Sequence, residues 1–432
     1  MRVLPFIILC LSKSAKILHY LKSQRRYAMD LETLKAAYPE ALKYHKGGKV
    51  STAPRKRLRS IDELGLAYTP GVAVPCKQIE ANPLSAYDYT SKSNLVAVIS
   101  NGTAVLGLGD IGAVASKPVM EGKAILFKTF ADVDAFDIEV NEKDVDKFVA
   151  VVKAIAPTFG GINLEDIKAP ECFEIESRLI KELDIPVMHD DQHGTAIIST
   201  AAIINALHLV NKKAEDIKVV VFGAGAAAIA CAKMYKALGV KNLVMFDSKG
   251  AISADRTDLN AMKQEFVCKE NYKSFKDALN EADVLLGLSK GNLLVADDIM
   301  GMNASPLIFA LSNPIPEIMP DVVKKARPDA IIATGRSDFP NQINNVIGFP
   351  FIFKGALKVR ASKINEEMKF AAARAIAELA REPITEKLEV LLKKKMQFGV
   401  DYIIPSAFDE RLIDIVPNAV AEAAIKSGVA RI

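Results

Sequence analysis

The sequence predicts an α/β fold in two domains, the second of them built on a doubly wound parallel sheet. From residue 216 onward, runs of β-branched residues alternate strictly with helical runs, which is typical of βαβ units. A glycine-rich turn follows the first of these strands and opens the next helix. We therefore assign residues 29–191 to an N-terminal α/β domain and residues 192–432 to the C-terminal domain, with residues 1–28 outside the fold.

The composition is that of a globular chain with large apolar cores. Half of the 432 residues are hydrophobic, a quarter are charged, and the net charge is +4. Because this charge is small and dispersed, we expect no nucleic-acid partner. We expect no apolar run of membrane-spanning length and therefore no membrane partner. The five cysteines include no Cys-x-x-Cys pair, which favours reduced thiols and a cytoplasmic location.

The first 28 residues combine an apolar run, residues 3–11, with basic residues that follow it. A secretory signal has the opposite order, with its basic residues before the apolar run. Two explanations fit this stretch. It is an organelle presequence, or the start of the chain has been assigned upstream of the true start site. Organellar targeting by residues 1–28 is thus the alternative to the cytoplasm.

Several elements of the N-terminal domain follow from local patterns. Apolar runs at 94–100 and 103–108 flank Asn101-Gly102, which predicts a β-hairpin. Further strands are expected at 135–140 and 185–188, and helices at 30–46, with an interruption near Pro39, and at 118–130, 145–155, 172–183 and 196–209.

A dinucleotide-binding turn is predicted at Gly223-x-Gly225-x-x-Ala228, between the strand 218–222 and a helix. Gly223 allows a tight turn, Gly225 lets backbone N–H groups approach a pyrophosphate, and Ala228 permits close packing of helix and strand. Ala226 belongs to the same turn. The context makes this a Rossmann-type site for NADP or NAD.

The choice between the two cofactors depends on the end of the next strand. Asp247 would bind the ribose hydroxyls of NAD, whereas Lys249 would neutralise the 2′-phosphate of NADP. A second glycine motif, Gly107-Leu-Gly109-Asp-Ile-Gly112, follows the predicted hairpin, and Lys117-Pro118 interrupts the helix expected after it. We interpret this motif as a backbone crossing beside the active site.

Two pairs of acids, Glu165-Asp166 and Asp190-Asp191, stand at the ends of structured elements. Three carboxylates with water and substrate oxygens suit the octahedral ions Mg²⁺ or Mn²⁺. Acids are also common at helix N-termini, so helix capping is an equally good interpretation of each pair. His189 and His193 have a spacing seen in zinc sites, but in a strand end and loop we expect them to pack or to bond a carboxylate.

Four more residues are candidates because of where they stand. Tyr68 is presented by a Pro-Gly turn, and Lys123 lies in a predicted helix. Asn313 and Asn345 follow strands, at the edge of a doubly wound sheet where ligands bind. The alternative interpretations are that Tyr68 is a packed aromatic side chain, that Lys123 is an exposed lysine, and that the two asparagines only form turns.

In order along residues 30–420, these motifs resemble those of the malic enzymes, most closely the short microbial type. The matching motifs are Tyr68-Thr-Pro-Gly-Val-Ala, Gly107-Leu-Gly-Asp-Ile-Gly, Glu121-Gly-Lys123, Leu164-Glu-Asp166, His189-Asp-Asp-Gln-His-Gly-Thr195, the Gly223 turn, Leu311-Ser-Asn-Pro314 and Asn344-Asn345. The resemblance implies an N-terminal catalytic domain over residues 29–191, a homodimer or larger homo-oligomer, and malate as substrate.

The resemblance also implies a role for each matching residue. Glu165, Asp166 and Asp191 are implied as metal ligands. Lys123, next to Asp190, is implied as general base and must be neutral to act, so we expect its pKa to be lowered by burial and by the nearby cation. The remaining implied residues are Tyr68 as general acid, Asn313 and Asn345 as contacts to the substrate carboxylate, and Asn313 also at the cofactor. This sequence differs from the family pattern at Ala104. The longer animal forms have an arginine at this position, and it binds the substrate carboxylate.

The implied activity is oxidative decarboxylation of (S)-malate to pyruvate and CO₂, with reduction of NAD(P)⁺ and dependence on a divalent metal. Decarboxylation of oxaloacetate is implied as well. Two alternatives follow from the residues alone. One is a metal-independent amino-acid dehydrogenase of similar two-domain build, and the other is a non-catalytic nucleotide-binding regulator.

Overall fold

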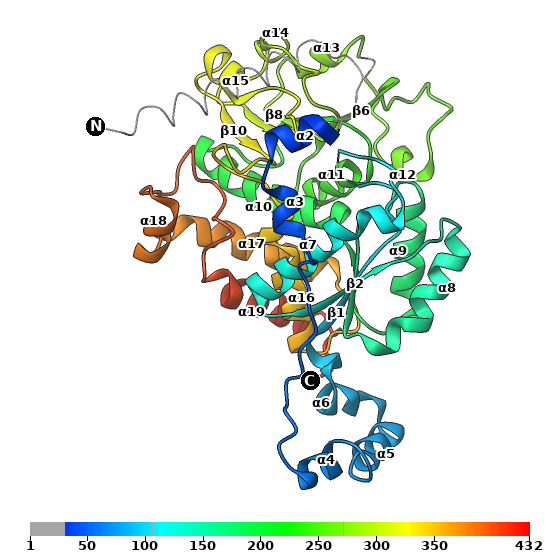
Figure 1. Ribbon diagram of the computed structural model, residues 1–432. Coiled ribbons are helices and arrows are strands. Elements are labelled where there is room, and N and C mark those ends of the chain that lie inside the picture. Colours follow the sequence, from blue (N-terminus) through cyan, green and yellow to red (C-terminus); the bar gives the residue numbers. More distant parts are fainter. Residues whose placement is uncertain (1–30, 106, 271) are drawn as a thin grey trace. The chain divides into compact units, whose positions relative to one another are not determined.

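A computed structural model describes residues 31–105, 107–270 and 272–432 (Figure 1). The expectations for residues 1–28 therefore lie outside the described residues. The chain divides into two compact units, residues 1–48 and 49–432. The described part of the first unit contains the helices α2 (Leu31–Ala37) and α3 (Ala41–His45). All strands described below belong to the second unit.

A four-stranded sheet with the order β2-β1-β3-β4 is parallel throughout. Its strands are β1 (Leu95–Ser100), β2 (Asp134–Glu139), β3 (Gly161–Leu164) and β4 (Val187–His189). The helices that connect them are α7 (Ala113–Ala131), α8 (Val145–Ile155) and α9 (Glu171–Glu182). Leu95, Ala97 and Ile99 face a core shared with α8 and α9, whereas Val96 and Val98 face a core shared with α7. This alternation shows a sheet covered on both faces.

The predicted hairpin at Asn101-Gly102 is wrong. Both edges of β1 are occupied by parallel partners, β2 and β3, so no edge is left for residues 103–108. The amides of Thr103 and Ala104 instead donate to the carbonyl of Asp166. The helix expected at 118–130 is also longer than predicted, because α7 begins at Ala113 and continues through Pro118.

A six-stranded sheet has the order β10-β9-β8-β5-β6-β7, and only β7 is antiparallel to its neighbour. Its strands are β5 (Lys218–Phe222), β6 (Asn242–Asp247), β7 (Gly250–Ala251), β8 (Val284–Gly287), β9 (Leu307–Ala310) and β10 (Ile331–Thr334). Successive strands are added on one side of β5 and then on the other. This reversal of order is that of a doubly wound sheet, and it confirms the predicted fold class.

The helix α10 (Asp190–Val210) leads from the first sheet to the second. It starts earlier than the predicted 196–209, because Asp190 and Asp191 form its first turn, where acids are favourable. Within the part of the chain that the structure describes, α10 is long and apolar enough to cross a membrane, so the expectation that no such run exists is wrong. Two thirds (67%) of its apolar window is buried inside the protein, as in the core helix of a globular domain.

Helices near the C-terminus complete the core around α7 and α10 (Figure 1). They are α16 (Phe349–Lys358), α17 (Glu366–Arg381), α18 (Glu386–Leu392) and α19 (Leu412–Lys426). The ring of Phe127 on α7 meets those of Phe349 and Phe353 edge-on, with centroids 4.8 and 5.5 Å apart. One buried cluster therefore contains residues of both sheets. The division at residues 191 and 192 stays a prediction.

The other helices of the second unit are short, apart from α11 (Ala226–Leu238) after β5. They are α4 (Ile61–Ala67), α5 (Ala73–Ala81), α6 (Ala86–Tyr89), α12 (Ala261–Gln264), α13 (Phe275–Leu279), α14 (Ala296–Ile299) and α15 (Pro320–Ala326), with the 3₁₀ turns η1 (Pro83–Ser85), η2 (Ser91–Asn94), η3 (Ala156–Thr158) and η4 (Asn345–Ile347).

Candidate metal and dinucleotide sites

Three carboxylates meet at the C-terminal edge of the four-stranded sheet. Glu165 and Asp166 directly follow β3, and Asp191 lies in the first turn of α10, just after β4. Since β3 and β4 are neighbouring parallel strands, their ends lie side by side. One oxygen of each of the three carboxylates lies within 4.8 Å of the others. Glu165 and Asp166 are buried, so their negative charges are costly without a compensating cation.

Asp166 adopts a left-handed backbone conformation, with φ of +53°. Its backbone N–H donates to Asp191 Oδ2 over 2.8 Å, and its carbonyl accepts from Thr103 and Ala104. Such a conformation is unfavourable for a residue with a side chain and persists where its surroundings hold it. The turn thus joins the loop after β3 to the start of α10.

Lys123 extends from α7 into this acidic cluster and is not an exposed lysine. Its Nζ lies 2.5 Å from Asp190 Oδ2 and 3.0 Å from Glu165 Oε1. Its Nζ also lies 4.6 Å from the centroid of the Phe349 ring. The structure therefore brings Lys123 and Asp190 together with Glu165, Asp166 and Asp191.

The charged groups of this cluster shift one another's pKa values. Burial lowers the pKa of Lys123, but the charges of Asp190, Glu165 and Asp191 together raise it above its ordinary value. The expectation of a lowered pKa is therefore not met by the protein groups alone. Burial raises the pKa of Glu165 well above its ordinary value, and although Lys123 lowers it, Asp191, Asp190 and Asp166 raise it further. A divalent cation among the carboxylates would oppose both effects, so these residues fit one.

Two asparagines contact the cluster through hydrogen bonds. Asn163, on β3, donates from Nδ2 to Glu165 Oε2 over 3.0 Å. Asn345, in η4 after β10, donates from Nδ2 to Asp190 Oδ2 over 3.2 Å and accepts at Oδ1 from the Thr195 hydroxyl over 3.0 Å. The contacts of Asn345 place the acidic cluster beside the C-terminal edge of the six-stranded sheet. Sequence reasoning did not find Asn163, although its spacing of two from Glu165 puts both on one face of a strand.

A buried network lies behind the first turn of α10. Glu176, on α9, accepts from the backbone N–H of His189 over 2.8 Å and from Gln192 Nε2 over 3.2 Å. His193 Nε2 lies 3.0 Å from Glu176 Oε1, and His193 Nδ1 lies 3.2 Å from Nζ of the buried Lys369 on α17. The expectation that His193 bonds a carboxylate is confirmed. Sequence reasoning missed Glu176 and Lys369, which have no local signal because they come from other helices.

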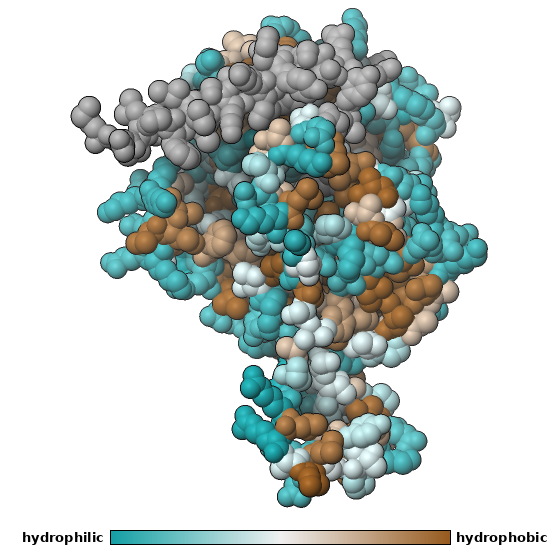
Figure 2. All heavy atoms as spheres, viewed as in Figure 1, coloured by the Kyte–Doolittle hydropathy of each residue, from teal (hydrophilic) through white to brown (hydrophobic). Residues whose placement is uncertain are grey.

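Tyr68 is not brought to the acidic cluster. It caps the C-terminus of α4 and is 69% exposed. No residue of α4 or α5 is buried in the described chain, and both lie in a small lobe of the second unit (Figure 1). Brown apolar side chains are visible on this lobe in Figure 2. Ile61 and Leu66 of α4 are among the exposed large apolar residues of the described chain.

The predicted dinucleotide turn has the required backbone geometry. Gly223 has φ of +130°, and a Cβ at this position would lie 2.4 Å from the carbonyl oxygen of Leu288. Gly225 is the N-cap of α11, and a Cβ there would meet no atom within 4 Å. Ala228 is buried against β5 and its neighbours, as close packing requires. The N-terminus of α11 beside Ala226 thus faces open space that suits a phosphate.

The second glycine motif is a backbone crossing, as predicted. Gly107, Gly109 and Gly112 all have positive φ in the loop before α7. A Cβ on Gly102 would lie 2.3 Å from the carbonyl oxygen of Gly112, so the two backbones pass in contact.

Asp247, at the end of β6, is paired with two cations that sequence reasoning missed. Arg256 Nη1 lies 2.7 Å from Asp247 Oδ1, and Lys263 Nζ lies 2.6 Å from Asp247 Oδ2. Burial raises the pKa of Asp247, but the hydrogen bonds from Arg256 and Lys263 outweigh burial and lower it to about 2. Lys249 donates its backbone N–H to Asp247, while its Nζ lies 2.6 Å from Asp258 Oδ2.

Asn313 lies beyond β9, at the same edge of the six-stranded sheet. Its Nδ2 donates to the carbonyl of Leu311 over 3.4 Å. The chain passes so close at Gly335 that a Cβ there would lie 2.3 Å from this nitrogen. Asn313 is therefore held at the edge where the predicted cofactor would bind.

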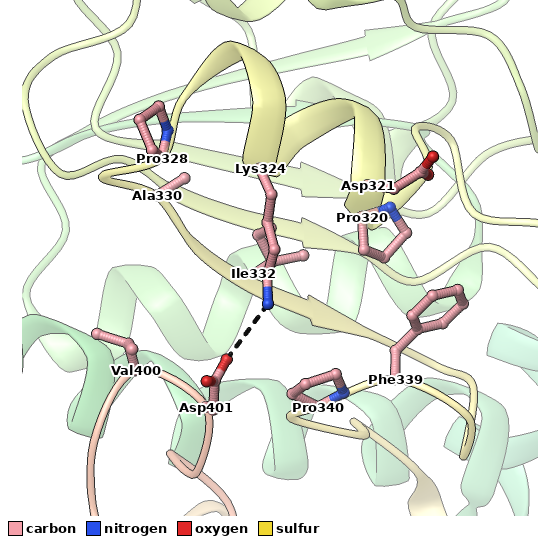
Figure 3. Close-up of a pocket in the computed structure, with 10 residues that line it drawn as sticks. All are labelled: Pro320, Asp321, Lys324, Pro328, Ala330, Ile332, Phe339, Pro340, Val400 and Asp401. Atoms are coloured by element: carbon pink, nitrogen blue, oxygen red, sulfur yellow. Dashed lines mark ion pairs between the residues drawn. The ribbon is translucent and has the colours of Figure 1, made fainter.

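A hollow of about 480 Å³ lies elsewhere, between α15, β10 and the chain near residue 400 (Figure 3). Its walls are mostly apolar, and Lys324 points across it toward Asp401, with 3.6 Å between Nζ and Oδ1. None of its lining residues belongs to the acidic cluster or to the glycine turn.

Comparison with known proteins identifies the family. The model of the malic enzyme N-terminal domain matches residues 47–180, and the model of the malic enzyme NAD-binding domain matches residues 192–394. A probable NADP-dependent malic enzyme of Rickettsia prowazekii is 56% identical over 408 residues, which are 93% of this chain and 53% of that protein. An NADP-dependent malic enzyme of Halomonas elongata is 53% identical over 90% of this chain and 94% of its own length.

The same comparison extends to solved structures. The crystal structure of a malic enzyme from Pyrococcus horikoshii has a TM-score of 0.84 and 46% identity, and it covers 91% of this chain and 92% of its own. The chain thus spans about half the length of the Rickettsia relative, and nearly the full length of the Halomonas and Pyrococcus ones. Two family models and three relatives agree over both sheets, and the chain belongs to the malic enzyme family.

Proposed function

We propose that the chain catalyses the oxidative decarboxylation of (S)-malate to pyruvate and CO₂ with reduction of NAD(P)⁺, and that it also decarboxylates oxaloacetate. The observation that carries this proposal is the convergence of Lys123 with three buried or half-buried carboxylates beside the edge of a dinucleotide-binding sheet. An oxidation that starts at a hydroxyl needs a base there, and the later loss of CO₂ needs positive charge on the neighbouring oxygen.

A resident Mg²⁺ or Mn²⁺ fits the donor set, which contains only carboxylate oxygens. Glu165, Asp166 and Asp191 would hold it. When bound, the ion supplies positive charge to the C2 oxygen of the substrate and favours a neutral Lys123.

The remaining steps belong to residues of the chain. Lys123, as the neutral amine, accepts the proton of the C2 hydroxyl while hydride leaves C2 for the nicotinamide. Asp190 orients the Lys123 amine through the contact of 2.5 Å. Asn313 and Asn345 stand at the sheet edge where the substrate carboxylate and nicotinamide would meet. After CO₂ has left, Tyr68 delivers a proton to C3.

Tyr68 reaches an acidic cluster only if another copy of the chain supplies it, so we propose a homodimer or larger homo-oligomer. The exposed lobe around Tyr68 supports this proposal. Large apolar side chains lie on it without cover from the described chain: Leu58, Ile61, Leu64, Leu66 and Val74. Exposed apolar surface of this kind marks interfaces. In such an assembly the lobe of one copy would complete the site of the other.

The cofactor we propose is NADP, with NAD also usable. Asp247 would repel a 2′-phosphate if its charge were free, but Arg256 and Lys263 neutralise it. With Lys249 and Asp258 included, three cations face two carboxylates at this position. The positive excess favours a phosphate. The names of the Rickettsia and Halomonas relatives agree with this preference.

We also propose a cytoplasmic location, supported only by cysteine usage. Cys172, Cys231 and Cys268 are free and buried, as is usual for reduced thiols. No nucleic-acid or membrane partner is proposed.

The proposed reaction is tested by formation of NADPH from malate and Mn²⁺, with and without EDTA. EDTA should abolish turnover, whereas a metal-independent amino-acid dehydrogenase would keep its activity on its own substrate. A purely regulatory protein would form no NADPH at all. In addition, Asp191→Ala should abolish both malate oxidation and oxaloacetate decarboxylation, because both need the ion. Oxaloacetate decarboxylation at the wild-type rate in this variant would refute the proposed metal site.

A further inference from the structure

We infer that Asn163 is a positioning residue for the metal site, which acts by fixing the carboxylate of Glu165. This inference rests on the proposed function. Asn163 and Glu165 lie two residues apart, at and just after the end of β3, so their side chains share one side of the chain. The Asn163 amide donates from Nδ2 to Glu165 Oε2 over 3.0 Å, and Lys123 Nζ lies 3.0 Å from Glu165 Oε1.

The two contacts fix Glu165 from both of its oxygens. A carboxylate that is held at one oxygen can still rotate about its last bond, whereas one held at both has a defined plane. The Lys123 contact alone holds only Oε1 of Glu165. The Asn163 amide supplies the second contact, at Oε2.

Asn163 stands in surroundings that favour an apolar residue. Its neighbours in register are Val98 on β1 and Met188 on β4, and all three side chains are buried. Its Oδ1 has no hydrogen-bond partner among the residues that the structure describes. A buried polar atom without a partner costs stability, so fold stability alone does not explain an asparagine at this position. Among the residues that the structure describes, the Asn163 side chain donates its hydrogen bond to Glu165.

The consequence is a specific dependence of metal affinity on Asn163. Hydrogen bonds to ligating carboxylates orient them, and loss of such a partner typically weakens metal binding by about 10- to 100-fold. We expect this effect in the metal affinity of the enzyme without substrate, before any chemistry takes place.

The experiment measures Mn²⁺ binding to the full chain without substrate, from the electron paramagnetic resonance signal of free Mn²⁺. The variants are Asn163→Leu, which keeps the branched shape of the side chain but is larger, and Asn163→Ala, which adds no new contact and serves if the leucine variant does not fold. For both, the dissociation constant should rise by about 10- to 100-fold relative to the wild type. Thermal unfolding of each variant is recorded in parallel.

Asn205→Leu is the matched control, because Asn205 is equally buried but purely structural. Its Nδ2 donates to the carbonyls of Ala377 and Ile403, each over 2.8 Å, and its Oδ1 accepts from Arg381. This variant should lower the melting temperature and leave Mn²⁺ binding at the wild-type value. If both Asn163 variants bind Mn²⁺ within twofold of the wild type, the inference is overturned. If the wild type itself binds no Mn²⁺, the proposed metal site fails, and this inference fails with it.

Discussion

The Thr195 hydroxyl donates a hydrogen bond to Asn345 Oδ1 over 3.0 Å, and this contact joins the start of α10 to the edge of the six-stranded sheet. From Asn345 the connection continues to Asp190 Oδ2 over 3.2 Å, and from the same oxygen to Lys123 Nζ over 2.5 Å. The orientation of the proposed base is therefore set by residues of α10 and of η4, the turn that follows β10. Thr195 contributes to this orientation only through its hydrogen bond to Asn345.

Replacing Thr195 by valine should lower kcat about tenfold, because one hydrogen bond that orients Asn345, and through it Asp190, is lost. The KM for malate should change less than twofold, since a change in orientation of the base acts on the chemical step more than on substrate binding. Steady-state kinetics with malate at saturating Mn²⁺ and NADP measure both constants. A raised KM at unchanged kcat would instead assign Asn345 to substrate binding alone.

The chain offers a control for this substitution on the same helix. Thr200 is fully buried, and its hydroxyl has no hydrogen-bond partner within residues 31–432, positions 106 and 271 aside. Thr200→Val should therefore leave both kinetic constants near the wild-type values and should not lower stability. Thr195→Ser, which retains the hydroxyl, should recover most of the lost rate.

The parts of this site that the sequence predicted are those with a local signal. The turn at Gly223 is recognisable because a predicted strand precedes it and a predicted helix follows. The strand β3 before Glu165-Asp166 was not predicted, because its Gly160-Gly161 start has the composition of a loop. The hairpin at Asn101 failed because a local turn signal does not reveal that both edges of β1 have parallel partners.

The supporting residues had no such signal. Arg256 and Lys263 reach Asp247 only after β7 has turned the chain back. Glu176 and Lys369 lie on α9 and α17, and only the packing of these helices against α10 brings them together. Contacts of this kind depend on the complete fold, so a reading of local patterns cannot supply them.

Glu176→Gln should destabilise the protein at neutral pH by roughly 3 kcal/mol, because it removes the buried carboxylate that accepts from the His189 N–H and from Gln192 and that contacts His193. Burial opposes the charge of Glu176, but His193 and His189 lower its pKa to about 2, below the ordinary value of 4.5. A lowered pKa in the folded state adds stability above pH 4.5, and this stability is lost as the pH falls toward 2. The difference in free energy of unfolding between wild type and variant should therefore be constant from pH 7 to 5 and should decrease below pH 4.5. Urea unfolding at pH 7, 5 and 4 measures it.

The control for Glu176 is Glu174→Gln on the same helix. Glu174 is exposed and lies 3.4 Å from Arg178, a surface pair that adds little to stability. This variant should unfold within about 0.5 kcal/mol of the wild type at every pH. A difference in unfolding free energy between Glu176→Gln and the wild type that is the same at pH 7, 5 and 4 would show that the Glu176 carboxylate is not the source of this stability.

Lys263→Ala should raise the KM for NADP about tenfold and change the KM for NAD by less than twofold. The reason is that Lys263 supplies one of the charges that offset Asp247 where a 2′-phosphate would lie, and NAD has no such phosphate. Initial rates with each cofactor at saturating malate and Mn²⁺ give the two constants. Lys233→Ala is the control, because Lys233 on α11 pairs with Glu265 and not with Asp247. An equal rise in the KM for NADP and for NAD would show that Lys263 stabilises the turn and does not bind the phosphate.

Alanine at Gly223 and at Gly225 should separate folding from cofactor binding. At Gly223, φ of +130° and a Cβ only 2.4 Å from a backbone oxygen make the substitution a strained one, so the melting temperature should fall by several degrees. At Gly225 the backbone conformation is ordinary, with φ of −85°, and the Cβ would meet no protein atom, so the melting temperature should stay within about a degree. The same Cβ would enter the space that a pyrophosphate needs at the N-terminus of α11, so the KM for NADP should rise at least about tenfold. A Gly225→Ala enzyme with an unchanged KM for both cofactors would remove this turn from the cofactor site.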